Sequence, residues 1–323
     1  MEVCRTGFSV ENVRQLFKSI YPLLSLLSKL IITSKFRVYC QLVRLPNIFT
    51  SISDIVAGCI LATHAFIDLH KMLLLASVSG CLYGGGVVFN DIFDCSTDIT
   101  ERPGRPLPSG TVGKREAIYL GIILFLTALL CSLLVNTTSL CISIVIILLV
   151  MSYNVWTKTV PVIGTFNMGL CRFFNLMLGL SIIPASISTY WMFPLILMIY
   201  VMLITALSKQ EVKGEQRWKI GIIITCFIGL VLFIGSLSVK GLLPNHAMHG
   251  LLFIFTMIVL WPMSRTFINP CPKNIQSTIK TMVLSIIILD ACFVMGSTDG
   301  IHVLVVLALL VPAYIISRFL YVT

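Results

Sequence analysis

The stretch NDIFDCSTD, residues 90–98, closes a long apolar run, residues 72–89, in a chain where charge is scarce. Its carboxylates, Asp91, Asp94 and Asp98, are three and four residues apart, so they share one face if the helix continues. Carboxylates this close repel one another in a low dielectric, and a divalent cation removes the repulsion. Oxygen ligands suit Mg²⁺, which binds through one or two carboxylates and substrate phosphates. The pattern predicts a magnesium site at the end of a membrane helix; the alternative is a solvated loop.

The composition is that of an integral membrane protein. Of the 323 residues, 57% are hydrophobic and 11% are charged, whereas soluble proteins carry about 25% charged residues. Helices satisfy their own backbone groups in lipid, and each needs roughly 20 apolar residues to cross it. We predict an all-α polytopic bundle of nine transmembrane helices, or ten if the last run is a helix rather than a re-entrant hairpin partner. The runs lie at residues 47–67, 71–90, 116–135, 138–156, 162–186, 190–208, 218–239, 248–268, 277–296 and 301–321.

The segment before the first run has a different character. Residues 13–33 mix Arg14, Lys18 and Lys29 with Leu and Ile, which predicts a helix lying at the membrane interface. The recurring basic residues and the lack of a small-residue cleavage site argue against a cleavable signal peptide. We therefore divide the chain into an N-terminal cytoplasmic or interfacial segment, residues 1–40, and a transmembrane domain, residues 41–323.

The basic residues indicate the topology. Most of the 23 Lys and Arg side chains lie on one predicted side, which holds the N-terminus and the loops after the second, fourth, sixth and eighth runs. The positive-inside rule places this side, with the acidic motifs, in the cytoplasm of a multi-pass membrane protein. In a bacterium this would be the plasma (inner) membrane. The net charge of +10 then indicates contact with anionic membrane lipid and not with nucleic acid.

Polar residues also interrupt the apolar runs. Asp54, in the first run, either lines a polar cavity or pairs with a neighbouring helix. Arg172 and Asn175 lie one turn apart in the fifth run. A buried arginine needs an anionic partner. We expect a bound diphosphate, and the alternative is a structural pair with Asp54 or Asp290.

Two features flank the first acidic motif. Gly84, Gly85 and Gly86 permit close approach of either another helix or a ligand. The proline-rich residues 103–108 cannot continue a regular helix, so they predict an ordered cytoplasmic turn. This turn would hold Arg102 and Arg105 close behind the carboxylates.

A second acidic pair follows the sixth run. Glu211 and Glu215 are four residues apart and lie on the same predicted side of the membrane as the first motif. Two acidic clusters separated by four runs predict two related halves whose motifs meet at one cavity. Taken by itself, a loop rich in Glu and Lys is equally typical of a solvated face.

The Asn-Asp-x-x-Asp-x-x-x-Asp motif, followed by Arg-Pro-x-Arg-Pro-Leu-Pro-Ser-Gly, resembles the UbiA superfamily of intramembrane prenyltransferases, from about Leu42 onward. Residues 83–110, 167–179 and 208–214 resemble more closely the branch named EboC. The resemblance implies a UbiA-like domain of about nine helices in residues 41–323, around a central cavity that opens to lipid. It also implies Mg²⁺ held by the two acidic motifs and a prenyl diphosphate donor.

The resemblance further implies roles for single residues. The metal ligands would be Asn90, Asp91, Asp94, Asp98, Glu211 and Glu215, and catalysis would depend on Asp91, Asp94, Asp98 and Glu211. Substrate would be bound by Asn47, Asn90, Arg102, Arg105, Tyr153, Lys158, Arg172 and Asn175. Many members of the family carry Asp-x-x-x-Asp as the second motif, whereas this chain has Glu-Val-Lys-Gly-Glu.

These residues predict a prenyltransferase. Mg²⁺ with Arg and Lys stabilises the leaving diphosphate as the allylic C–O bond breaks, and an apolar cavity shelters the carbocation from water. A lipophilic or aromatic acceptor then attacks the carbocation. Two alternatives remain: a terpene cyclase that needs no separate acceptor, and a non-catalytic carrier or transporter of a lipophilic precursor that uses the same acids for ion coupling.

Overall fold

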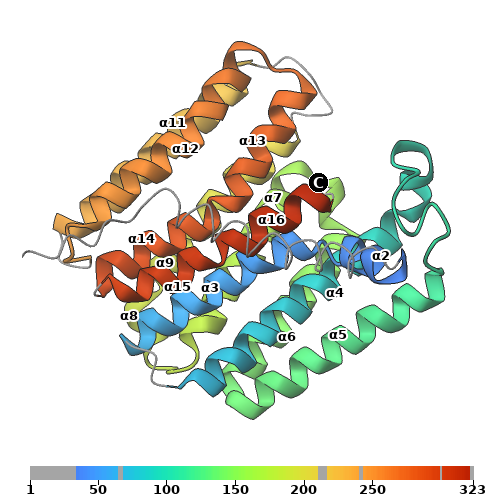
Figure 1. The fold of residues 1–323 in the computed structure, drawn as a ribbon, viewed down its shortest axis with the longest axis horizontal. Helices are drawn as coiled ribbons and strands as arrows, with labels where there is room; N and C mark the ends of the chain where they lie inside the picture. Colours follow the sequence, from blue (N-terminus) through green and yellow to red (C-terminus); the bar gives the residue numbers. More distant parts are fainter. Residues whose placement is uncertain (1–33, 65–67, 210–216, 240–242, 299, 321–323) are drawn as a thin grey trace, which may run out of the picture.

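The computed structural model describes residues 34–64, 68–209, 217–239, 243–298 and 300–320, and all regular structure within them is helical (Figure 1). Eight helices of this part are long and apolar enough to cross a membrane, and α9 is a shorter apolar helix. The elements are α2 (Ser34–Leu42), α3 (Leu45–Thr63), α4 (Leu69–Glu101), α5 (Lys114–Val135), α6 (Thr137–Val155), the 3-10 helix η1 (Thr157–Thr159), α7 (Pro161–Leu180), α8 (Ser186–Tyr190), α9 (Met192–Ser208), α11 (Arg217–Val239), α12 (Met248–Ile268), α13 (Pro272–Leu284), α14 (Ile286–Ser297), α15 (Ile301–Ala308) and α16 (Leu310–Phe319).

The predicted all-α membrane fold is confirmed. Apart from the fifth, every apolar run coincides with a helix or with two abutting helices, and the last run is the pair α15 and α16. The fifth run, residues 162–186, differs from the prediction because α7 ends at Leu180 and a turn precedes α8. Pro184 lies in this turn, where it has no N–H to donate and disfavours a helical conformation at the preceding residue. The interfacial helix predicted at residues 13–33 lies outside the described residues, and the boundary between residues 40 and 41 stays a prediction.

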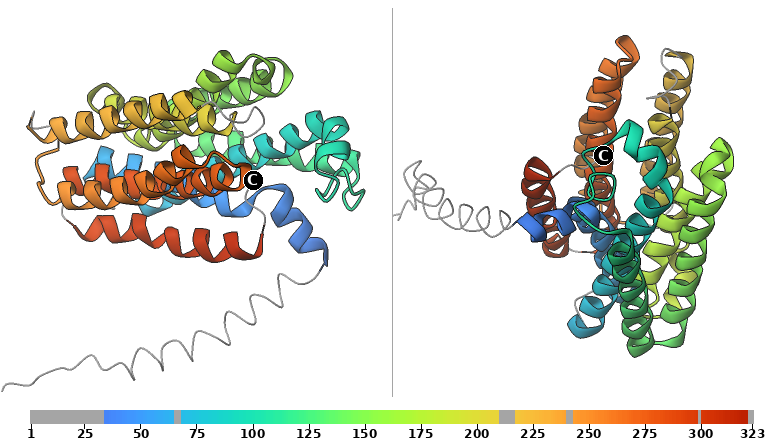
Figure 2. Two further views of the ribbon diagram at one scale, coloured as in Figure 1. Left: turned by 90° about the horizontal axis from the view of Figure 1, so that it is seen from above. Right: turned by 90° about the vertical axis from the view of Figure 1, so that its right-hand side faces the viewer.

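Helix α3 is the centre of the bundle. It packs against α4, α7, α14 and α16, and Figure 1 shows it between the α4–α6 group and the group formed by α11–α14. The helices run roughly parallel or antiparallel to one another (Figure 2). Of the apolar stretch of α3 that could cross the membrane, 72% is buried inside the protein, so this helix contacts other helices far more than lipid.

Two glycines bring the backbones of α3 and α7 into contact. A Cβ atom at Gly179 would lie 2.7 Å from the carbonyl oxygen of Ile55, and one at Gly58 would lie 2.9 Å from Cα of Gly179. Small residues of this kind allow close helix packing in membranes. The crossing therefore fixes the separation of α3 and α7, the two helices that carry Asp54 and Arg172.

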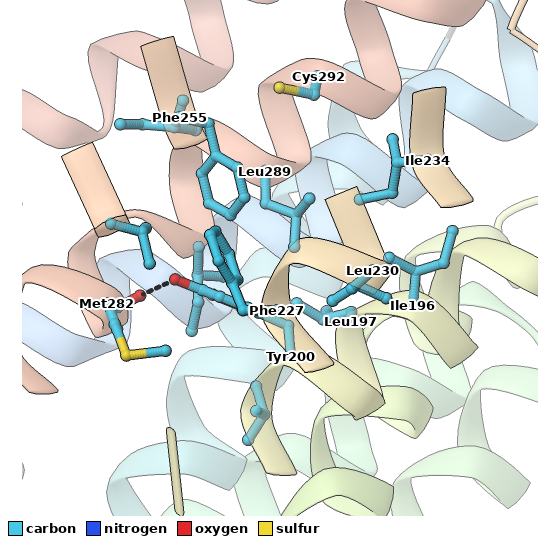
Figure 3. Packing of buried hydrophobic residues seen from close by; sticks show 14 of the residues in the cluster. Ile196, Leu197, Tyr200, Phe227, Leu230, Ile234, Phe255, Met282, Leu289 and Cys292 are labelled. Carbon is cyan, nitrogen blue, oxygen red and sulfur yellow. Dashed lines mark hydrogen bonds between the residues drawn. The ribbon is translucent and has the colours of Figure 1, made fainter. Parts of the chain in front are cut away.

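A separate aromatic core holds the C-terminal half together. The rings of Tyr200, Phe227 and Phe255 pack on one another with centroids 5.4 to 6.0 Å apart, as Figure 3 shows. The Tyr200 hydroxyl also lies 3.2 Å from the backbone carbonyl oxygen of Met282 and 2.7 Å from Oγ of Ser285. These contacts tie α9 to α11, α12 and α13.

Helix α4 is unusually long for a membrane helix. Its 33 residues span about 50 Å, whereas the hydrocarbon core of a bilayer is about 30 Å thick. The helix continues through residues 90–98 and ends at Glu101, after which residues 102–113 form turns. Hydrogen bonds from Arg105 N to Arg102 O, 3.1 Å, and from Val112 N to Pro106 O, 3.2 Å, order this segment. The structure thus contains the turn predicted from residues 103–108.

Substitution of Gly179 by Ala should destabilise the protein. The added methyl group would force the α3 and α7 backbones apart, at a cost of about 1–3 kcal/mol. Thermal unfolding in detergent, followed by size-exclusion chromatography, should show a lower melting temperature for Gly179→Ala. Gly229→Ala is the matched control, because a Cβ at Gly229 meets nothing within 4 Å and Ala favours the helix. Equal melting temperatures for the two variants would contradict the close crossing.

Candidate active site

The acidic face of α4 meets basic side chains from two other segments. Nη2 of Arg44 lies 3.1 Å from Oδ1 of Asp91. Nη1 of Arg105 lies 3.4 Å from the same Oδ1 and 2.6 Å from Oδ2 of Asp98. One guanidinium therefore joins two carboxylates that stand two turns apart on α4, and both of these carboxylates are buried.

The backbone conformation of Arg44 places its side chain in this site. Arg44 caps the start of α3 with φ 49° and ψ 55°, a left-handed conformation that is uncommon for residues other than glycine. Pro46 then sits in the first turn of α3, where its missing N–H costs no hydrogen bond. The sequence pattern did not predict a role for Arg44 in the site. The available signal was a basic residue directly before a helix that begins with proline.

Asp94 points to different partners. Its carboxylate forms an ion pair with Lys158 on η1, and the Lys158 ammonium lies 6.0 Å from the centroid of the Phe93 ring. Tyr153, near the end of α6, is close enough to interact electrostatically with Asp94. The side chain of Asp94 is 31% exposed, compared with 5% for Asp91 and Asp98. Asp94 is thus the most accessible of these carboxylates.

A cavity of about 380 Å³ opens beside Asp91. Arg102, exposed and in no ion pair with another described residue, lines it together with Arg44 and Arg105. Cationic side chains outnumber carboxylates along its wall, so the cavity attracts anions. The complete lining is Gln41, Arg44, Asp91, Arg102, Gly104, Arg105 and Pro106.

The donor atoms of this site fit Mg²⁺. Within the described residues, no three His, Cys, Asp or Glu side chains are close enough together to form a metal site by themselves. Mg²⁺ does not require such a cage, because it usually binds through one or two carboxylates, waters and substrate phosphates. Asp91 and Asp98, which both contact the Arg105 guanidinium, supply carboxylate oxygens as possible metal ligands. Asn90 directly precedes Asp91 on α4. Glu211 and Glu215, the predicted second motif, lie outside the described residues.

A second group of predicted site residues lies together elsewhere in the bundle. Nη1 of Arg172 is 2.9 Å from Oδ2 of Asp54, and Nδ2 of Asn175 is 2.7 Å from the same oxygen. The sequence left two possible partners for Arg172, a bound diphosphate or a structural aspartate. In the structure, Arg172 pairs with the aspartate Asp54. Asn47 is buried at the start of α3, where its carbonyl oxygen accepts a hydrogen bond from Thr50. Within the described part of the chain, the side chains of Arg172 and Asn175 pair with Asp54, Thr50, Ser51 and Ser79 and not with the acidic residues of α4.

The glycines before the motif are packed against neighbouring helices. A Cβ at Gly85 would lie 2.6 Å from the ring of Phe125, and one at Gly86 would lie 3.0 Å from Val150. Phe125 belongs to α5 and Val150 to α6. Of the two interpretations left open by the sequence, the structure favours helix packing over ligand contact.

Comparison with known proteins finds a prenyltransferase family and relatives named as synthases. The model of the UbiA prenyltransferase family matches residues 52–263. A digeranylgeranylglyceryl phosphate synthase of Sulfurisphaera tokodaii is 26% identical over 79% of this chain and 97% of its own length. The synthase of the same name from Saccharolobus solfataricus is 28% identical over 56% of this chain and 63% of its own length.

Solved structures share the fold. A structure described as digeranylgeranylglyceryl phosphate synthase superposes with a TM-score of 0.61 and 22% identity, covering 82% of this chain and 99% of the other. A UbiA homologue from Archaeoglobus fulgidus, bound to GPP and Mg²⁺, superposes with a TM-score of 0.54 and 16% identity, covering 79% and 99% of the two chains. At these identities the likeness concerns the fold.

Arg105→Ala should lower the stability of the folded protein. Of the ion pairs described above, the substitution removes that of Asp98 and leaves Asp91 paired with Arg44 alone. The free energy of unfolding should fall by about 1–3 kcal/mol. Arg105→Lys should recover part of the loss, because the ammonium keeps the positive charge on a shorter side chain. Thermal unfolding in detergent measures the effect. Arg115→Ala, at an exposed position of α5, serves as the control, and an equally small shift for both alanine variants would rule out the bridge.

Proposed function

The chain belongs to the UbiA prenyltransferase family, whose model covers more than half of it, and from this premise we propose that it moves a prenyl group from a prenyl diphosphate to a lipophilic acceptor within the membrane. The family resemblance seen in the sequence is confirmed. The closer resemblance to the EboC branch stays a prediction.

The observation that carries the proposal is the pairing of acids and bases at the end of α4. Asp91, Asp94 and Asp98 are each held by a cation, and Arg102 faces the adjoining cavity without an ion-pair partner in the described part of the chain. A magnesium diphosphate carries both kinds of charge, so its phosphate oxygens complement the basic side chains and its metal complements the carboxylates.

The donor class rests on this charge pattern and on related proteins. The UbiA homologue from Archaeoglobus fulgidus has been solved with GPP and Mg²⁺ and with DMAPP and Mg²⁺. We propose that Asn90, Asp91, Asp94 and Asp98 hold Mg²⁺ here, with Glu211 and Glu215 completing the site. When bound, Mg²⁺ would stabilise the negative charge that grows on the diphosphate as the allylic C–O bond breaks.

The basic side chains have two roles in this proposal. Arg44 and Arg105 hold the carboxylates of Asp91 and Asp98 in place. Arg102 and Lys158 contact the diphosphate and stabilise it as the electron pair of the breaking C–O bond moves onto its oxygen. Tyr153, beside Asp94, closes the same end of the site. Substrate contacts by Asn47, Arg172 and Asn175 stay predictions.

The acceptor is proposed from the relatives. Digeranylgeranylglyceryl phosphate, named in the relatives from Sulfurisphaera tokodaii and Saccharolobus solfataricus, is a glyceryl phosphate with two prenyl chains. A synthase makes the compound it is named for, and in this one both remaining glycerol oxygens carry prenyl chains. We therefore propose an acceptor with one chain fewer, a membrane lipid whose free hydroxyl forms a C–O bond to the allylic carbon as the diphosphate leaves and then loses its proton. The distribution of basic residues supports a cytoplasmic position for this site.

Asp94→Asn should lower the rate of prenyl transfer by roughly 10²–10³-fold, because the charge that holds the metal is removed. The assay incubates purified protein in detergent with radiolabelled geranylgeranyl diphosphate, Mg²⁺ and a membrane lipid extract, and measures released diphosphate and labelled lipid. Chelation of Mg²⁺ by EDTA should abolish both products. Asp68→Asn is the control: Asp68 caps the opposite end of α4, and Asn is an equally good cap.

The products separate the candidate functions. Diphosphate and a labelled acceptor lipid together support prenyl transfer. A labelled cyclic hydrocarbon formed without acceptor indicates a terpene cyclase. Movement of a prenyl lipid across vesicles without diphosphate release contradicts the enzyme and favours a carrier.

A further inference from the structure

A second ionic cluster lies inside the bundle, apart from the acidic face of α4. Asp54 on α3 and Asp290 on α14 are both completely buried, with 0% of each residue exposed. Arg172 on α7 approaches them from a third helix. The proposed reaction gives Asp54 and Asp290 no task.

One oxygen of each aspartate is fully engaged. Oδ2 of Asp54 accepts hydrogen bonds from Arg172 at 2.9 Å and from Asn175 at 2.7 Å. Oδ2 of Asp290 accepts a hydrogen bond from the Ser53 hydroxyl at 2.5 Å. Ser53 and Asp54 are neighbours in the chain, and the two carboxyl groups are close enough to interact electrostatically.

The other oxygen of each aspartate has no partner. Oδ1 of Asp54 and Oδ1 of Asp290 are buried and accept no hydrogen bond in the structure. A buried carboxylate oxygen without a donor is costly, since water is absent. Each of the two interacting aspartates therefore has one buried oxygen that lacks a donor.

The charge of the cluster is also unbalanced. Arg172 neutralises Asp54, while Asp290 forms no ion pair with any described Lys, Arg or His. Two ionised carboxylates would leave an excess negative charge in the middle of a membrane protein, where such charges are rare and are paired. Among the described residues, the ionisable groups that act on the pair include Arg172 from α7 and Cys292 on α14 itself. The ring of Tyr83 from α4 lies 5.6 Å from the Arg172 guanidinium.

We propose that Asp54 and Asp290 form a binding site for one proton, which Asp290 carries on Oδ1 and donates to Oδ1 of Asp54. A single O–H group supplies the hydrogen bond that both orphan oxygens lack. It also reduces the cluster to one arginine, one carboxylate and one neutral acid. A water molecule would satisfy the oxygens but would leave the excess charge. A sodium ion would remove the charge, and it is the competing occupant that the experiment separates.

Infrared spectroscopy tests the proposal directly. Detergent-solubilised full-length protein, with and without ¹³C-labelled aspartate, should show at neutral pH the carbonyl stretch of a protonated carboxylic acid, shifted by the label. The band should disappear in Asp290→Asn and remain in Asp68→Asn, whose site is exposed. Absence of the band in the unsubstituted protein at neutral pH would overturn the proposal.

Stability measurements provide the second readout. Asp290→Asn should fold with a melting temperature close to that of the unsubstituted protein, because its amide oxygen accepts from Ser53 and its NH₂ donates to Asp54. Asp290→Leu should melt several degrees lower, because it leaves the Ser53 hydroxyl and an Asp54 oxygen unpaired. Replacing Na⁺ by choline should not change the melting temperature of the unsubstituted protein. A fall in melting temperature on removal of Na⁺ would assign the site to a cation and refute the proton.

Discussion

The structure depends on one constraint: a carboxylate removed from water must meet a cation or carry a proton. The folded chain satisfies it in three ways. Arg105 bridges two carboxylates at the end of α4, Lys158 reaches Asp94 from η1, and Arg172 meets Asp54 in the middle of the bundle. The Lys158 and Arg172 pairs join elements distant in sequence, so at these two places electrostatic neutrality and tertiary structure are satisfied together.

Close packing of α3 and α7 makes the central pair possible. Gly58 and Gly179 let the two backbones touch, which brings Arg172 within hydrogen-bonding distance of Asp54 and of the Thr50 hydroxyl. The polar cluster and the glycine crossing therefore support each other. Without the glycine crossing, Arg172 would be too far from Asp54 to pair with it. Without the polar cluster, the crossing would lose the hydrogen bonds that join α3 to α7.

The sequence predicted the fold well and the site in part. Apolar runs of about 20 residues locate membrane helices because lipid imposes that length on any helix that crosses it. The three-four spacing of Asp91, Asp94 and Asp98 predicted their shared helix. The spacing could not reveal that Asp94 pairs with Lys158 while Asp91 and Asp98 share Arg105. This pairing depends on where the segments that carry Lys158 and Arg105 lie in the fold. Arg44 was missed because its importance comes from a left-handed backbone at a helix start.

Arg172 shows the limit of such reasoning. Its isolation in an apolar run required an anionic partner, but a ligand and a distant aspartate meet that requirement equally well. The choice depends on the separation of α3 and α7, which two glycines set and which no local pattern encodes.

The length of α4 has a consequence for the surroundings of the protein. About 20 of its 33 residues suffice to cross the hydrocarbon, so roughly a third of the helix extends past it. If the apolar run of residues 72–89 fills the hydrocarbon, residues 90–98 stand near the boundary with water. A substrate with an ionic head and a hydrocarbon tail would then be held with each end in its preferred solvent. Because a helix cannot change its length, bilayer thickness determines how deeply the acidic turns sit. The lipid composition of the host membrane would thereby adjust the hydration of the reacting groups without any change in the protein.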